Sequence, residues 1–323
     1  MQTVTLGRTG LEVSVVALGA GGHSRLGLRG GASEAEAANL VRAAIDRGVT
    51  IIDTAPVYGT EDVIGMGLEG RRDGIVVSSK VRVNVAGSSN ESSDFVALAD
   101  IRASVETSLR KLRTDRLDIL HLHGVRPQQY DYAVNTLLPE LQRLQAEGKV
   151  RFLGITEGFG VDVEHAMLRR AIADGVWDVL MLGYNFVNPS AARHVLPEAE
   201  ARNLGTMAMY AVRGALSNSD SLGRLIERLA AQGEVDLTVP FAKDAAGLLL
   251  ADGVAGSLTE AAYRFCRHSK GIHVVMTGTG NLAHLEQNIA AINGPALPAE
   301  TLQHLSDIFG RVKTATGDPE KPT

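Results

Sequence analysis

The amino-acid sequence predicts a single closed α/β barrel of eight parallel strands, the (β/α)8 or TIM-barrel fold. Eight short apolar segments recur along the 323 residues, and helix-like segments separate them. They are almost continuously apolar rather than alternating, which is typical of parallel strands buried on both faces. Such a barrel needs about 250 residues, so one domain accounts for the chain. The predicted strands are 15–18, 50–53, 74–80, 117–123, 150–156, 179–184, 205–210 and 273–278.

The segment before the first strand predicts a β-hairpin. Residues 1–14 contain two short strand-like stretches on either side of a Thr-Gly turn at 9–10. We expect this hairpin to cap the bottom of the barrel. The first helix is expected over residues 33–47, because Ser33 can cap its start and Glu36, three residues on, completes a capping box.

Two segments in the last third of the chain depart from the repeat of strand and helix. Residues 213–257 are glycine-rich and interrupted, which predicts an insertion before the last strand. Residues 317–323, GDPEKPT, predict a frayed tail, since chain ends are rarely ordered unless something ties them down. Neither segment indicates a domain boundary, so the predicted domain is 1–323.

Composition excludes several classes of function. The net charge is −5 and no basic cluster is present, which argues against nucleic-acid binding. Cys266 is the single cysteine, so we expect no disulfide framework and no cysteine-based metal site, and we assign no metal. The sequence shows neither a signal peptide nor an apolar run long enough for a membrane helix. We therefore expect a cytoplasmic protein that acts on a small molecule; composition does not predict the oligomeric state.

Four ionisable residues fall at the ends of consecutive predicted strands. Asp53 ends the second strand and Tyr58 follows it, Lys80 ends the third, and His123 ends the fourth. Active sites of TIM barrels lie at the C-terminal ends of the strands, so these side chains are expected to converge. His121 lies on the same strand face as His123; we interpret it either as a core histidine or as a substrate contact.

These residue types suit the interconversion of a carbonyl and an alcohol. Free tyrosine has a pKa of about 10, and a neighbouring ammonium such as Lys80 lowers it by favouring the phenolate. Asp53 would keep Lys80 charged and in place, and His123 could hydrogen-bond the carbonyl oxygen. A hydride cannot come from a side chain, so a nicotinamide cofactor is implied.

Several stretches carry a resemblance to a known enzyme family. They are LGRTGLEVS, IDTAPVYG, SSK, LRKLRTDRLDILHLH, GKVRFLGIT and, less closely, TGTGNLAHLEQN. Through these stretches, which are spread over nearly its whole length, the chain resembles the aldo-keto reductase family. The resemblance implies that Asp53, Tyr58, Lys80 and His123 form the catalytic tetrad, and that the barrel binds NADP or NAD without a Rossmann domain.

Other interpretations of the same residues stay open. Singly, each member of the tetrad has an ordinary structural explanation, such as a turn-forming aspartate or a core histidine. Lys80 on such a barrel also suits a Schiff-base aldolase. A redox-neutral lyase or isomerase that retains its cofactor, or a non-catalytic barrel that binds nucleotide, are further alternatives.

The glycine-rich segment after the first strand is interpreted as a rim loop. LGAGGHSRLGLRGG lacks the third glycine and the adjacent helix of a dinucleotide fingerprint. By resemblance, Gly19 and Ala20 lie near the nicotinamide, and His23 and Arg25 are candidate substrate contacts. Polar rim residues and an aromatic content of 4% favour a polar substrate such as a sugar, a lactol or a glycoside.

The expected nicotinamide pocket departs from the family pattern at three places. A Ser-Asn pair after the fifth strand becomes Thr156 and Glu157, and a glutamine on the sixth becomes Met181. On the seventh, an aromatic residue becomes Met209, followed directly by Tyr210. Methionine can still pack against a ring face.

Glu157 suggests a hypothesis about the direction of the reaction. An ionised carboxylate beside the ring would favour the positively charged oxidised cofactor, by up to about 4 kcal/mol at an effective dielectric of about 20. This would bias the enzyme toward oxidation. The alternative is that Glu157 turns away and caps the following helix.

The choice between NADP and NAD rests on the segment after the last strand. The expected cofactor contacts there are Gly278, Thr279, Asn281, His284, Gln287 and Asn288, with Arg213 along the pyrophosphate. No lysine or arginine lies between Lys270 and Arg311. Since cationic contacts strengthen a site for the ribose phosphate, we expect weak discrimination in favour of NADP, or real use of NAD.

Overall fold

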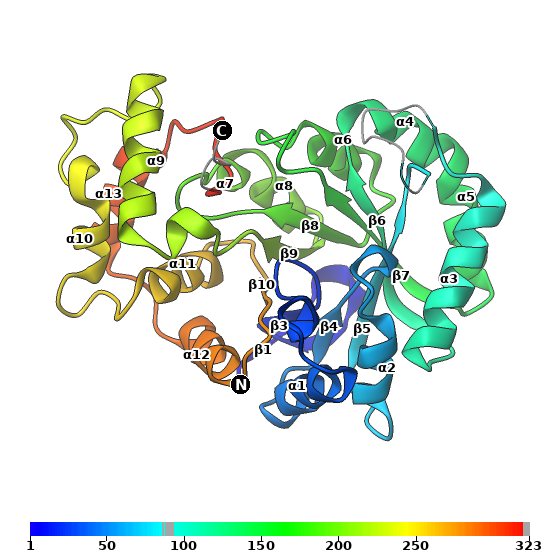
Figure 1. The fold of residues 1–323 in the computed structure, drawn as a ribbon. Helices are drawn as coiled ribbons and strands as arrows, with labels where there is room; N and C mark the ends of the chain where they lie inside the picture. Colours follow the sequence, from blue (N-terminus) through cyan, green and yellow to red (C-terminus); the bar gives the residue numbers. More distant parts are fainter. Residues whose placement is uncertain (86, 88–93, 319–323) are drawn as a thin grey trace.

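The computed structural model describes residues 1–85, 87 and 94–318, and it confirms the predicted barrel. Eight parallel strands close in the order β10-β3-β4-β5-β6-β7-β8-β9, with helices around them (Figure 1). Each end of a predicted strand lies no more than two residues from the observed end. The strands are β3 (Val16–Gly19), β4 (Ile51–Asp53), β5 (Val76–Arg82), β6 (Leu117–Val125), β7 (Val150–Glu157), β8 (Val179–Gly183), β9 (Gly205–Met209) and β10 (Val274–Thr277).

The helices of the described residues cover the outside of the barrel and extend beyond it on one side (Figure 1). None of them is long and apolar enough to cross a membrane. They are α1 (Glu34–Asp46), α2 (Glu61–Leu68), α3 (Leu98–Leu112), α4 (Tyr130–Tyr132), α5 (Leu138–Ala146), α6 (Ala166–Asp174), α7 (Ala191–His194), α8 (Leu196–Ala201), α9 (Ser219–Ala231), α10 (Ala245–Leu250), α11 (Leu258–Arg267), α12 (Leu282–Asn293) and α13 (Ala299–Phe309).

Alternation along the strands separates the barrel lumen from the layer under the helices. Leu120 and Leu122 of β6 pack in the large apolar cluster between strands and helices. Inward positions such as Ile51 and Met181 form a second cluster that fills the lumen. His121, between the two leucines, therefore faces the lumen, as expected from a period of two.

The predicted hairpin is present and closes the bottom of the barrel. Its strands are β1 (Thr3–Thr5) and β2 (Glu12–Ser14), paired antiparallel. Leu6 and Leu11 of its loop belong to the lumen cluster, so they plug the N-terminal end of the strands. Gly10 ends the turn with a φ of 67°, a left-handed conformation that favours glycine.

The capping box at the first helix is confirmed. The hydroxyl of Ser33 accepts a hydrogen bond from the backbone N–H of Glu36 at 3.3 Å, and the Glu36 carboxylate accepts one from the Ser33 N–H at 2.8 Å. These bonds satisfy donors that the first helical turn leaves without partners. Helix α1 consequently begins at Glu34, inside the predicted range.

Residues 213–257, the expected insertion, contain helices α9 and α10. With α13 they build a third apolar cluster beside the barrel, at the left of Figure 1. Leu225 of α9 and Ile308 of α13 are buried in this cluster. We call this part of the structure the helical lobe.

The prediction of a frayed tail from residue 317 is wrong for its first two residues. The carbonyl of Gly317 accepts a hydrogen bond from the N–H of Ala215 at 3.1 Å. Asp318 binds both the Nε and an Nη of Arg213, each at 2.6 Å. A tail can be fixed wherever its backbone groups find partners. The other predicted tail residues, 319–323, lie outside the described residues.

Candidate active site

The four residues predicted at the strand ends meet at the C-terminal mouth of the barrel. The Lys80 Nζ lies 2.5 Å from Asp53 Oδ2 and donates to the Thr54 carbonyl at 2.8 Å, and both side chains of the ion pair are buried. The Tyr58 hydroxyl lies 3.2 Å from His123 Nε2. The Lys80 Nζ is 5.2 Å from the centre of the Tyr58 ring. The buried pair of Lys80 and Asp53 therefore lies next to Tyr58, which in turn contacts His123.

Local structure explains how Asp53 and Tyr58 are held. Asp53 is in register with Ser78 of β5, whose hydroxyl donates to Asp53 Oδ1 at 2.8 Å. A short 3-10 turn, Pro56–Tyr58, then carries the phenol over the mouth. Gly21 lies against the ring, where a Cβ would come within 2.8 Å of it, so a larger residue would displace Tyr58.

Burial dominates the pKa values at this mouth. It lowers the pKa of His123 to about 3, helped by the positive charges of Lys80 and Arg82. Burial also raises the pKa of Tyr58, and the Lys80 ammonium opposes that rise without cancelling it. The expected direction of the lysine effect is thus right, but the expectation that the pKa of Tyr58 falls is wrong for this structure. Although burial disfavours the charged amine, the Asp53 carboxylate raises the pKa of Lys80.

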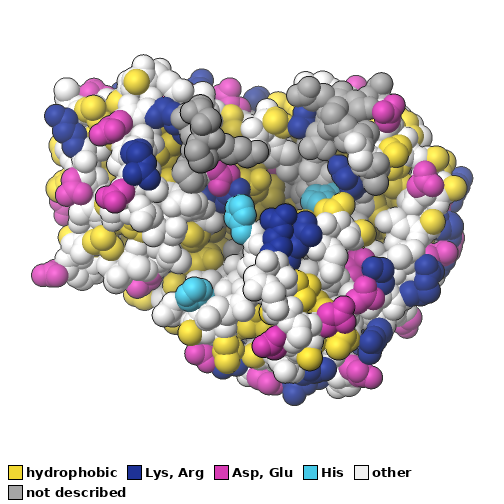
Figure 2. All heavy atoms as spheres, in the orientation of Figure 1, with side chains coloured by type: hydrophobic (Ala, Val, Ile, Leu, Met, Phe, Trp, Pro, Cys, Tyr) yellow, Lys and Arg dark blue, Asp and Glu magenta, His cyan; other side chains and the backbone are white. Residues whose placement is uncertain are grey.

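A cleft of about 1320 Å³ opens from Tyr58 along the barrel mouth to the start of α12. It brings together most of the residues predicted to contact a cofactor. Predicted residues on its wall are Gly19, Met181, Met209, Tyr210, Arg213, Gly278, Thr279, Asn281, His284, Gln287 and Asn288, with His23 at the rim. Figure 2 shows the hollow near the centre of this face, with His and Lys or Arg side chains around it.

The cleft fits a nicotinamide dinucleotide by the chemistry of its walls. At the Tyr58 end, the thioethers of Met181, Met209 and Met276 and the Tyr210 ring offer a soft apolar surface for a flat ring. At the other end, the start of α12 offers backbone N–H groups and a helix dipole, which attract anions. A bound dinucleotide would therefore place its ring beside Tyr58 and its phosphates toward α12.

Some predicted cofactor contacts already have partners within the protein. The Asn288 amide donates to the Thr277 hydroxyl at 2.8 Å. The Thr279 hydroxyl accepts from the Asn281 N–H at 3.1 Å, which closes the turn before α12. Ala20 is buried and does not line the cleft, so its predicted contact with the nicotinamide is not supported by the geometry.

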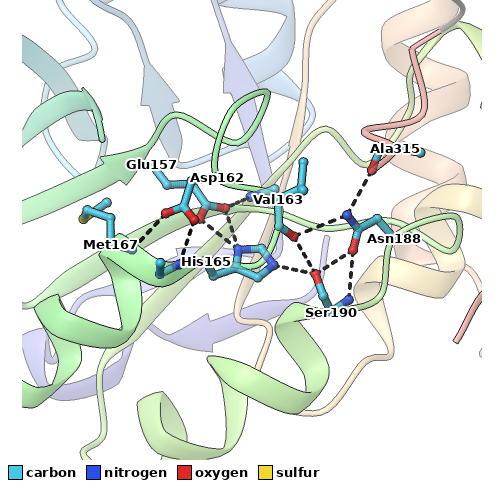
Figure 3. A network of polar contacts seen from close by, with 10 residues as sticks. Glu157, Asp162, Val163, His165, Met167, Asn188, Ser190 and Ala315 are labelled. Carbon is cyan, nitrogen blue, oxygen red and sulfur yellow. Dashed lines mark hydrogen bonds and ion pairs between the residues drawn. The ribbon is translucent and has the colours of Figure 1, made fainter. Parts of the chain in front are cut away.

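Glu157 does not lie beside the cleft. It is the last residue of β7, and alternation turns its side chain outward with that of Ile155. Its carboxylate has no exposed surface and lies 2.8 Å from His165 Nδ1 (Figure 3). It also accepts a hydrogen bond from the Gly183 N–H at 2.7 Å. The geometry therefore does not support the proposed electrostatic effect on the nicotinamide. The alternative is half right, since Glu157 turns away but Asp162 caps the helix.

The cap on α6 comes from the Asp162 carboxylate, which accepts from the N–H groups of Ala166 and Met167, both at 2.8 Å. On the other side of the ring, His165 Nε2 lies 2.9 Å from the Ser190 hydroxyl (Figure 3). A Ser-His-Glu series of this kind resembles a nucleophile site, but all three side chains are buried. We interpret it as a structural network that fixes the ends of β7 and β8.

Thr156, the neighbour of Glu157, is predicted to contact the nicotinamide; it faces the barrel mouth but does not line the cleft. Its hydroxyl accepts a hydrogen bond from the Gly124 N–H at 2.6 Å. This bond holds the backbone directly after His123, where the register between β6 and β7 shifts. Thr156 therefore helps to position the end of β6.

His121 belongs to the core rather than to a cavity wall. It is fully buried, and neither ring nitrogen has a hydrogen-bond partner among the described residues. Burial, followed by the charge of Lys80, lowers its pKa well below the usual value. Gly154 leaves room for the ring, since a Cβ there would come within 2.2 Å of it. Of the predicted substrate contacts, His23 lines the cleft, whereas Arg25 and His121 do not.

A second cavity, of about 460 Å³, lies on the His123 side of Tyr58. Several of its wall residues were not predicted, among them the large side chains of Arg82, Arg126 and Phe159. Arg82 had a usable signal, because it lies two residues after Lys80 on a strand and so faces the same side. Arg126 and Phe159 lie after their strands, where periodicity gives no signal.

The structure contains no group of three or more potential metal ligands among residues 1–85, 87 and 94–318.

Arg213, predicted along the pyrophosphate, lines the cleft but is paired with Asp318. Its guanidinium lies 4.2 Å from the centre of the Tyr210 ring. Tyr210 itself has a φ of 65°, which is rare for a bulky residue.

Comparisons with known proteins agree with this geometry. The family model described as Aldo/keto reductase family matches residues 17–308. L-galactose dehydrogenase of Arabidopsis thaliana is 31% identical over 324 residues, 96% of this chain and 95% of that protein. D-threo-aldose 1-dehydrogenase of Pseudomonas sp is 32% identical over 220 residues, 61% of this chain and 65% of that protein. An aldo-keto reductase structure from Klebsiella pneumoniae in complex with NADPH has a TM-score of 0.68 at 24% identity, covering 98% of both chains.

Proposed function

The chain belongs to the aldo/keto reductase family, and from this premise we propose that it is an NAD(P)-dependent dehydrogenase of a small sugar or similar polyhydroxylated substrate. The arrangement of Tyr58 with His123 at 3.2 Å, in front of the buried pair of Lys80 and Asp53, supports the proposal most directly. Two of its relatives are sugar dehydrogenases by name, an L-galactose dehydrogenase and an aldose 1-dehydrogenase.

Each tetrad residue has a separate role in the proposal. Bound in the cleft, a nicotinamide dinucleotide would accept a hydride from the substrate carbon in oxidation and return it in reduction. Tyr58 takes the hydroxyl proton of a lactol in oxidation, which leaves a lactone, and donates a proton to the carbonyl oxygen in reduction. His123, neutral because its pKa is about 3, orients the reacting oxygen. Lys80 places its charge behind the phenol, and Asp53 anchors Lys80.

The Schiff-base alternative fits the geometry poorly. A lysine that attacks a carbonyl must be a neutral amine. Lys80 is instead held as an ammonium by Asp53, which raises its pKa. A redox-neutral enzyme that retains its cofactor stays an alternative; it would release nucleotide on denaturation and turn over substrate with none added.

The test is a screen of sugars and simple alcohols with NADP and NAD, followed at 340 nm, for the wild type and Tyr58→Phe. We expect oxidation of at least one sugar and a loss of kcat/KM of about 100-fold or more in the variant, as for removal of a general acid or base. Tyr132→Phe is the matched control, since the Tyr132 hydroxyl bonds the Val96 carbonyl outside both cavities. Equal activity of wild type and Tyr58→Phe would refute the proposal.

A cytoplasmic location is part of the same proposal. Cys266 is a free, buried thiol, and structural disulfides are rare in reducing compartments. Fractionation of cells that express the natural protein would test it.

A further inference from the structure

Methionines gather at one part of the barrel mouth. The chain has seven methionines, and four of them lie on three neighbouring strands: Met181 on β8, Met207 and Met209 on β9, and Met276 on β10. All four side chains point into the lumen, where they pack in one apolar cluster. Three of them, all but Met207, also line the cleft that fits the dinucleotide.

Met209 and Met276 are the accessible members of this group. Val275 of β10 pairs with Ala208 of β9, so the next residues on the two strands, the two methionines, are neighbours at the mouth. Both are partly exposed, whereas the other two methionines of the cluster are buried. The terminal methyl group of Met276 lies against Gly19, where a Cβ would come within 3.2 Å of it. A small reagent that enters the cleft therefore meets these two thioethers first.

The single thiol of the chain does not compete with them for an oxidant. Cys266 is fully buried in α11, and its Sγ donates to the Tyr184 carbonyl at 3.2 Å. Burial raises the pKa of this thiol, which keeps it protonated. The thiolate is the form of cysteine that oxidants attack. The reactive sulfur at the cleft is therefore thioether sulfur.

A thioether reacts with hydrogen peroxide without any further reagent. The sulfur lone pair attacks one peroxide oxygen, the O–O bond breaks, and the products are methionine sulfoxide and water. Methionine sulfoxide reductases reverse the change: the oxygen leaves as water while a pair of thiols is oxidised to a disulfide. The sulfoxide is a polar side chain in place of an apolar one.

We propose that Met209 and Met276 form a reversible oxidation site, and that their conversion to sulfoxides closes the cleft to the nicotinamide ring of a dinucleotide. This inference rests on the proposed function, since it concerns the cofactor of the same site. The apolar wall at the Tyr58 end suits a flat, uncharged ring. A sulfoxide oxygen facing that ring loses its water and gains no hydrogen-bond donor, which costs free energy.

The test follows oxidation and affinity together in the wild-type enzyme. Purified enzyme is treated with increasing concentrations of hydrogen peroxide. Peptide mass spectrometry then gives the fraction oxidised at each methionine, and fluorescence titration gives the affinity for NADPH and NADH, whose nicotinamide ring is uncharged. We expect both affinities to fall about tenfold or more as Met209 and Met276 are oxidised. Methionine sulfoxide reductases A and B, one for each sulfoxide epimer, should restore them.

Bound nucleotide should shield the two thioethers. With saturating NADPH present during the treatment, we expect oxidation of Met209 and Met276 to slow by about fivefold or more, because a ligand in a pocket is covered over most of its surface. Met66 provides the comparison: it is also partly exposed, but it lies on α2 and lines neither cavity. Its oxidation should not change. Equal protection of all three methionines, or of none, would contradict a site in the cleft.

Leucine substitutions assign the loss of affinity to the two sulfur atoms. Leucine is close to methionine in volume and has no sulfur to oxidise. After the same treatment, the double variant Met209→Leu/Met276→Leu should keep its own untreated affinity to within about twofold. Met66→Leu, the matched control, should lose as much affinity as the wild type. If the double variant does not fold, the course of oxidation at each site and the protection by NADPH decide the question.

The outcomes separate this inference from the proposed function. If complete oxidation of Met209 and Met276 leaves nucleotide affinity unchanged, or if the double variant loses as much affinity as the wild type, the inference fails and the proposed function stands. If the untreated enzyme binds nucleotide but oxidises no sugar, only the proposed function fails. If it binds no nucleotide, both fail.

Discussion

At the scale of single residues, the chemistry depends on which protons Tyr58 and His123 hold. Burial is the largest influence on both: it raises the pKa of Tyr58 and lowers that of His123 to about 3. Near neutral pH the phenol is therefore protonated and the imidazole is neutral. The site is ready to donate a proton in reduction, whereas oxidation needs the phenolate, whose fraction increases with pH.

The first prediction is a difference between the pH profiles of the two directions. We expect kcat/KM for reduction to be constant from about pH 5 to 9, because neither group changes its charge in that range. For oxidation, kcat/KM should rise about tenfold per pH unit over the same range, because the pKa of the required base lies above it. Initial rates in both directions, in buffers of constant ionic strength, test this. A plateau of the oxidation rate below pH 8 would contradict it.

At the scale of one element, alternation along β7 decides what Glu157 does. The strand includes Glu157, so Thr156 faces the mouth and Glu157 faces the helices. The sequence predicted an end at 156, and this one missing residue left the direction of Glu157 open. Its carboxylate binds the backbone N–H of Gly183, at the end of β8, and the ring of His165.

The second prediction separates these roles through Glu157→Gln. We expect the free energy of unfolding to fall by about 1–3 kcal/mol, because a buried hydrogen-bonded carboxyl group is replaced by an amide that satisfies its partners less well. The ratio of affinities for the oxidised and reduced cofactor should stay within about twofold. Urea unfolding and nucleotide titrations give the two quantities. A large change in the affinity ratio with unchanged stability would restore the electrostatic hypothesis.

We expect the start of α12 to determine the cofactor preference. Thr279, Asn281 and His284 line this end of the cleft, with no arginine or lysine between Lys270 and Arg311. Glu260, at the start of α11, lines the same cleft but is paired with Arg264 at 2.9 Å. From the lack of cationic residues in this segment we expect weak binding of the extra phosphate of NADP.

The third prediction is that His284→Arg raises the affinity for NADP relative to NAD about tenfold, as expected for a charge-assisted contact to a phosphate. Ala283→Arg is the matched control, because Ala283 is exposed next to it on α12 and does not line the cleft. Fluorescence titrations of both nucleotides measure the ratio. Equal gains in the two variants would show a general effect of charge rather than a contact at position 284.

At the scale of the whole molecule, the barrel and its tetrad could be predicted because they follow from local pattern. Continuous apolar segments mark buried parallel strands, and the ends of such strands meet at one rim whatever the loops do. Asp53, Tyr58, Lys80 and His123 were therefore brought together correctly. The same reasoning needs the strand ends to within one residue, because one position reverses the direction of a side chain.

The errors lie where contacts distant in sequence decide the structure. Strand β5 continues past Lys80 to Arg82, and this continuation turns Arg82 toward the second cavity, beside His123. The pKa of Tyr58 depends on how fully the mouth is packed, which no spacing of residues reveals. The fixed tail depends on Ala215, about one hundred residues earlier in the chain. No periodic pattern records such pairings.

The helical lobe and the barrel mouth are joined by the segment after α13, and the last prediction concerns its contact with the cleft. Asp318 binds the Nε and one Nη of Arg213, which lines the cleft that fits the dinucleotide. In Asp318→Asn the guanidinium is released and a negative charge near the phosphates is removed, so we expect nucleotide affinity to rise about 3- to 10-fold. Stability should change by less than about 1 kcal/mol, since both partners are partly exposed. Titration of NADP and NAD into the single variants and the double variant with Arg213→Met tests this. The gain must vanish in the double variant; a gain that persists would mean that Asp318 acts on the nucleotide without Arg213.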